Sequence, residues 1–101
     1  MANEVIPEAL RRRYIDSFPA KSAALDEAAQ GLSAGGVEAL SALRLQAHKL
    51  AGSAGMYGFD DLGHLAREVV HAIDAGAGLP VLSAMVQSLA AGLTSAHAAV
   101  E

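Results

Sequence analysis

Residues 37–76 read VEALSALRLQAHKLAGSAGMYGFDDLGHLAREVVHAIDAG and contain two amphipathic segments with glycines between them. In the first segment, from Val37 to about Tyr57, apolar residues recur in steps of three and four, at positions 40, 43, 47, 50 and 54. This spacing places them on one face of an α-helix. The second segment, from about Phe59 to Ala75, has an equivalent face at positions 62, 65, 66, 69 and 73. Because the connection is short, we expect the two helices to pack antiparallel.

The flanking sequence predicts further helices. A proline at a first helical position starts a helix over Pro7–Ser17, and a second is expected from about Ala20 to Leu32. Whether Pro19 kinks one helix or separates two stays open. A last helix is expected over about Leu79–Val100. We therefore expect residues 1–101 to form a single all-α domain, an antiparallel up-down four-helix bundle with an additional N-terminal helical segment.

Composition narrows the possible functions. Hydrophobic residues make up 52% of the chain and charged residues 18%, which argues against a disordered segment. Without cysteine, disulfides and thiolate metal sites are excluded, and a net charge of −4 argues against a nucleic-acid-binding surface. Residues 75–100 carry no formal charge, but Pro80, Gln87 and His97 make them a poor membrane span. We expect a cytoplasmic protein that binds neither nucleic acid nor membrane.

One histidine lies off the apolar face of the 37–57 segment. At about 100° per residue, His48 points away from the core, with Gly52 one turn and Gly55 two turns further on and Ala51 between them. Glycine inside a helix lowers the stability of the helix by roughly 1 kcal/mol relative to alanine. Gly52 and Gly55 therefore weaken this helix and bring it no local structural benefit. Bare backbone beside an exposed imidazole would let another protein come close to the ring. The glycines could instead admit a neighbouring helix or end this one.

The stretch AHKLAGSAGMYGFDDLGHLA, residues 47–66, resembles the histidine-containing phosphotransfer (Hpt) domain of two-component phosphorelays. The family pattern is roughly Ala-His-x-Leu-x-Gly-Ser-x-x-x-x-Gly, followed by spaced leucines in the next helix. The matching residues are Ala47, His48, Leu50, Gly52, Ser53 and Gly58, and then Leu62, Leu65 and Ala66. The resemblance implies that His48 accepts a phosphoryl group from the aspartyl phosphate of one receiver domain and donates it to the aspartate of another.

The resemblance also implies partners and cofactors. Response-regulator receiver domains, or a hybrid histidine kinase, would dock over the exposed face of residues 41–55 and over the N-terminal helix. We expect Leu45 and Ser41 to be docking contacts. The receiver supplies Mg²⁺ and an acidic pocket, so we expect no cofactor, nucleotide or metal on this chain. The chain is then a monomeric phosphoryl carrier rather than a kinase. It could be free-standing or part of a larger kinase.

Two positions depart from the family pattern. The family often has a lysine three residues after the histidine, where this chain has Ala51. We expect three cations as substitutes: Lys49, which is adjacent in sequence, Arg44, which lies one turn back on the same face, and Arg67. Position 67 should face position 48 across the hairpin. Val70 stands where the family often has a polar or acidic residue that orients the histidine. These departures keep a second hypothesis open, a degenerate helical-bundle adaptor that binds a receiver or another regulator without being phosphorylated.

Two other clusters carry weaker signals. His64, Glu68 and His71 are spaced four and three apart on one helical face and could bind a metal, although such a stripe is more often a solvated face. The run Arg11–Arg13 could bind an acidic partner, but the exposed side of the first helix is the simpler interpretation.

Overall fold

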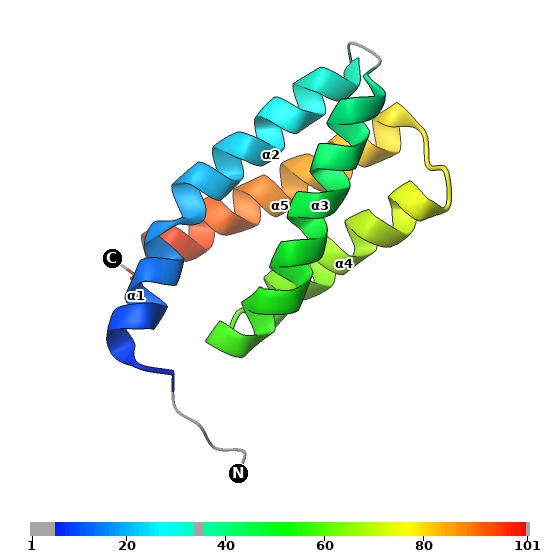
Figure 1. Ribbon diagram of the computed structural model, residues 1–101. Helices are drawn as coiled ribbons and strands as arrows, with labels where there is room; N and C mark the ends of the chain where they lie inside the picture. The colour runs from blue at the N-terminus through cyan, green and yellow to red at the C-terminus, as the bar shows by residue number, and fades with distance from the viewer. Residues whose placement is uncertain (1–5, 34–35, 101) are drawn as a thin grey trace.

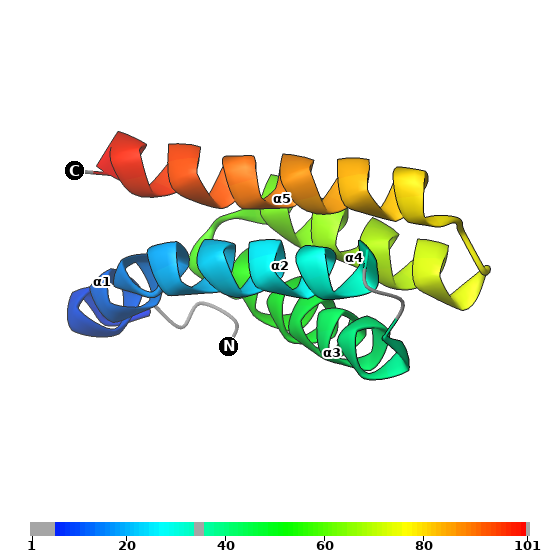
Figure 2. The ribbon, with the colours of Figure 1, turned by 90° about the horizontal axis from the view of Figure 1, so that it is seen from above.

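The structure is a computed structural model that describes residues 6–33 and 36–100. This part of the chain contains no strand, and its helices are α1 (Glu8–Asp16), α2 (Phe18–Ser33), α3 (Val37–Ser53), the 3₁₀ segment η1 (Ala54–Tyr57), α4 (Asp60–Asp74) and α5 (Leu79–Val100). Helices α2 to α5 form an antiparallel bundle, and α1 extends it at the end where α5 finishes (Figures 1 and 2). The predicted four-helix bundle with an N-terminal helical piece is confirmed. Residues 1–5, 34–35 and 101, which the expected single domain includes, lie outside the described residues.

The apolar stripes read from the sequence form the core. On α3, Leu43 and Ala47 are fully buried and Leu50 is 3% exposed. They pack with the corresponding stripes of the other three bundle helices, whose buried members include Leu25, Leu32, Leu62, Ala66, Val69, Val86, Leu89 and Leu93. Burial of each large aliphatic side chain contributes about 1.5–3 kcal/mol, so these stripes fix which face of α3 points outward.

The α3 helix ends earlier than the sequence predicts, whereas the other helix ends lie within one or two residues of the expected positions. The α-helix that was expected to reach about Tyr57 ends at Ser53, and the chain tightens into η1. Gly58 then reverses the chain with a φ of 90°, a left-handed conformation that glycine adopts without strain. The amide of Phe59 donates to the Ala54 carbonyl at 2.9 Å, which closes the turn before α4 begins.

Pro19 separates two helices rather than kinking one. It lies in the first turn of α2, where the missing N–H of proline has no helical partner to lose. Ser17 stands between the helices, and its amide donates to the Tyr14 carbonyl at 3.1 Å. Helix α1 can therefore lean towards the turn between α3 and α4.

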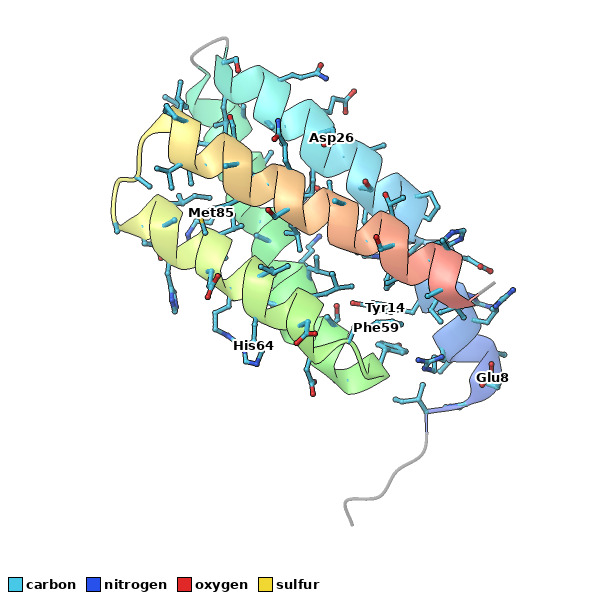
Figure 3. The ribbon with its side chains drawn as sticks, turned by 180° about the vertical axis from the view of Figure 1, so that it is seen from behind. Glu8, Tyr14, Asp26, Phe59, His64 and Met85 are labelled. Carbon is cyan, nitrogen blue, oxygen red and sulfur yellow. The ribbon has the colours of Figure 1, made fainter. Side chains whose placement is uncertain are left out.

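Aromatic packing holds α1 against this turn. The Tyr14 ring stacks on Tyr57 with centroids 4.0 Å apart, and the Tyr14 hydroxyl hydrogen-bonds to Ser53 Oγ at 2.6 Å. Phe59 lies close to Tyr14 (Figure 3) and meets Phe18 edge to face at 5.1 Å. Tyr57 and Phe59 thus close this end of the core, and their contacts fix α1 beside the C-terminal end of α3.

Helix α5 is long and apolar enough to cross a membrane by length and composition alone, with a mean hydropathy of 1.3 over its most apolar window. The core helix of a soluble protein passes the same test. In this structure Leu82, Val86, Leu89 and Leu93 of α5 are buried in the bundle core, between α2 and α4.

Candidate functional site

His48 lies on the outer face of α3. Its side chain is exposed, while Ala47 before it and Leu50 two residues after it point into the core. The ring has no hydrogen-bond partner in the described part of the chain. It is therefore accessible to another protein and is oriented only by its own backbone and by packing.

A shallow hollow of about 280 Å³ lies beside His48, between α3 and α4. Helix α3 contributes His48, Ala51 and Gly52 to its wall, and α4 contributes Arg67, Val70 and His71. The antiparallel hairpin through η1 brings these two sets together although they are about twenty residues apart in sequence. The expected placement of position 67 across the hairpin from position 48 agrees with this geometry.

The three small residues named from the sequence differ in their surroundings. A Cβ built at Gly52 meets nothing within 4 Å, so this side of His48 is open space. Ala51 is half-buried and lines the hollow. Gly55 lies beyond α3, in η1, where a Cβ would stand 3.3 Å from Asp60 Oδ1. Because the helix tightens before it, Gly55 does not line the hollow, and the open access lies at Gly52.

The three cations named as substitutes for the missing lysine point in different directions. Arg67 is exposed and lines the hollow with His48. Lys49 lines a different groove, between α3 and the α1–α2 segment, together with Tyr14 and Lys21. Arg44 makes a bidentate ion pair with Asp74 on α4, at 2.7 and 2.9 Å. Arg67 is thus the cation placed beside His48.

The Arg44–Asp74 pair is a surface tie between α3 and α4. The hydrogen bond from Arg44 holds the pKa of Asp74 below its ordinary value of 3.8, and the Coulombic effect of nearby His71 acts in the same direction. The same bond raises the pKa of Arg44. Asp74 is therefore charge-compensated and does not offer its carboxylate freely to the hollow.

The structure also places the histidine stripe of α4 and the basic run Arg11–Arg13, which carried the weaker sequence signals. Among the residues that the structure describes, no group of three or more histidine, aspartate or glutamate side chains could hold a metal. His64 projects from the outer side of α4 (Figure 3), with its Nδ1 3.4 Å from Arg67 Nη1. Arg11, of the basic run, is half-buried: its Nε donates to the Tyr57 carbonyl at 3.3 Å, and its guanidinium lies 5.2 Å from the Phe59 ring centroid.

The two residues expected to contact a partner are accessible. Leu45 is 52% exposed and Ser41 is exposed, both on the outer side of α3. An exposed leucine near His48 offers apolar area to a docked protein.

Sequence reasoning missed two contributors to this region. His71 was considered only as a metal ligand, yet it follows Arg67 by four residues, a spacing that places both on one helical face. Asp74 extends the same face and had no local signal for its partner, because Arg44 lies thirty residues earlier in the chain.

The sequence model of the Hpt domain matches residues 9–99, which is nearly the whole described chain. No curated protein and no solved structure gives a significant match. The match covers all five α-helices and includes the motif around His48. The chain therefore belongs to the Hpt domain family, whose members act in phosphotransfer within two-component signalling.

Proposed function

We propose that this protein relays a phosphoryl group between the aspartates of response-regulator receiver domains, with His48 as the acceptor and donor. The observation that carries the proposal is the exposed His48 ring beside the open space at Gly52, in a chain of the Hpt family. A receiver must bring its aspartyl phosphate within bonding distance of the ring, and a residue with a side chain at position 52 would stand in the way.

The proposed step is a displacement at phosphorus. The lone pair of one imidazole nitrogen of His48 attacks the phosphorus of the aspartyl phosphate, and a P–N bond forms as the P–O bond to the carboxyl oxygen breaks. The aspartate leaves as a carboxylate with the bonding electron pair, and the proton on the other ring nitrogen can pass to solvent. The reverse displacement on a second receiver regenerates His48. Positioning and charge neutralisation dominate such a step, because its transition state is loose.

The other residues have supporting roles in this proposal. Gly52 gives steric access, and Leu45 and Ser41 contact the docked receiver. Lys49 lies on the side of α3 that faces α2, where it can contact an acidic rim of the partner. Mg²⁺ belongs to the receiver. We further propose a cytoplasmic monomer whose partners are receiver domains, free or within a hybrid histidine kinase.

A second candidate function rests on a specific observation. His48 has no hydrogen-bond partner in residues 6–33 and 36–100, and Val70 presents only hydrocarbon to the hollow. A chain in this state could bind a receiver as an adaptor without carrying phosphate. Binding without labelling would distinguish the adaptor from the carrier.

The test is transfer from a panel of receivers that carry radiolabelled aspartyl phosphate. The carrier predicts acid-labile, alkali-stable label on the wild type and none on His48→Gln. It also predicts that the labelled wild type passes the label to a second, unlabelled receiver. Receivers that bind the wild type but never label it would instead support the adaptor.

A further inference from the structure

We propose that Arg67 and His71 of α4 form a binding site for the phosphoryl oxygens on His48, across the hollow that the three residues line. The inference rests on the proposed function of His48 and adds the group that holds the transferred phosphate. The pair belongs to the helix across the hollow from His48, so the positive charge approaches the phosphate from the opposite wall.

The lining of the hollow fits an anion. Its six residues include one guanidinium and the imidazoles of His48 and His71, and none carries a carboxylate. Guanidinium groups bind phosphate oxygens through paired N–H donors, and an imidazole N–H is a further donor.

The charges around the hollow leave Arg67 available. Among the described residues, its polar side-chain contact is the long one to His64 Nδ1 at 3.4 Å, which uses one of its five N–H groups. No carboxylate in the described part of the chain pairs with it. Asp74, which follows His71 by one turn, is held by the two bonds from Arg44. Arg44 thereby keeps the Asp74 carboxylate from competing with a phosphate.

The first experiment uses inorganic phosphate and needs no partner protein. Phosphate is added to the ¹⁵N-labelled protein, and shift changes are followed by NMR. We expect changes at His48, Arg67 and His71, with affinity falling about two- to fivefold in Arg67→Gln, as for an exposed ion pair. The matched control is Arg13→Gln, which removes an exposed arginine of α1 that does not line the hollow. Shifts that avoid the hollow, or an equal loss in Arg13→Gln, would overturn the site.

The second experiment labels the protein with phosphoramidate, a small donor, and follows the lifetime of the phosphate on His48, which NMR resolves from the other histidines. Acid promotes hydrolysis by protonating the phosphorylated ring, and a cation at the phosphoryl oxygens opposes that protonation. Near pH 6 we expect the half-life to fall about two- to fivefold in Arg67→Gln. Arg67→Lys should recover part of the loss, and Arg13→Gln should show none.

The two experiments separate this inference from the function beneath it. If a phosphorylated receiver labels His48 but all variants have equal half-lives, the relay stands and the Arg67–His71 site is wrong. If phosphate binds at the hollow but no receiver labels His48, the anion site stands and the relay fails.

Discussion

Replacing Gly52 by alanine should make the protein more stable and a poorer phosphotransfer partner. Gly52 lies in the last turn of α3, and a Cβ at that position meets nothing within 4 Å. Exchanging glycine for alanine in a helix therefore gains about 0.5–1 kcal/mol of folding free energy with no clash against it. For a domain of this size, that gain corresponds to an increase in Tm of roughly 2–8 °C.

The same methyl group points into the space through which a receiver must reach His48. A close-packed contact that must admit an extra group loses about 1–3 kcal/mol, or roughly 5- to 150-fold in rate. We expect the rate of transfer from a phosphorylated receiver to fall by roughly 5-fold in Gly52→Ala and by up to about 150-fold in Gly52→Gln. Labelling by phosphoramidate should change little, because this donor is small.

The assay pairs thermal melting by circular dichroism with the initial rate of transfer from each donor. Ala84→Gln is the control for added bulk, since Ala84 is exposed on α5, away from the hollow. A Gly52→Ala protein that melts below the wild type would refute the stability argument. A Gly52→Gln protein that takes phosphate from a receiver at the wild-type rate would refute the access argument.

Three further predictions concern the surroundings of the site. Tyr14→Phe loses the hydrogen bond to Ser53, so its free energy of unfolding, measured with urea, should be about 0.5–1.5 kcal/mol lower than that of the wild type. Because burial raises the pKa of Tyr14 above 10.0, the wild type should also lose stability as the pH rises above 10, and the variant should lose less. Since the Arg44 hydrogen bond lowers the pKa of Asp74, the pair's contribution should be complete above pH 3.8 and disappear as the pH falls through the lowered value. Acid unfolding of Asp74→Asn beside the wild type checks this, and parallel curves would contradict it. Leu45→Glu should slow receiver transfer several-fold without changing Tm, because Leu45 is half exposed and packs little in the fold; an unchanged rate would remove Leu45 from the interface.

The bundle could be predicted from sequence because its information is local and periodic. Positions 43, 47 and 50 recur at helical spacing, and all three are buried in the structure. The outward direction of His48 follows from the same periodicity. A hairpin through glycines then places position 67 opposite position 48 with no further assumption.

The polar contacts between helices could not be predicted in the same way. Tyr14 and Ser53 are 39 residues apart, and Arg44 and Asp74 are 30 apart. Each contact depends on how two helices are rotated towards each other and on the rotamers of two side chains. The local sequence around a single residue predicts neither of these. The tightening at Ala54 was missed for a related reason, since it depends on Gly58 turning the chain back so that Phe59 can bond to the Ala54 carbonyl.

The most direct measurement is to find which histidine carries the phosphate. The chain has four histidines, at positions 48, 64, 71 and 97. After treatment with phosphoramidate or with a phosphorylated receiver, ³¹P and ¹⁵N NMR can assign the P–N bond to one ring. We predict that a receiver forms the bond on His48 alone, that phosphoramidate also forms it on His48, and that His48→Gln takes no phosphate from a receiver. A bond that a receiver forms on His64, His71 or His97, or no bond from any receiver that binds, would contradict it.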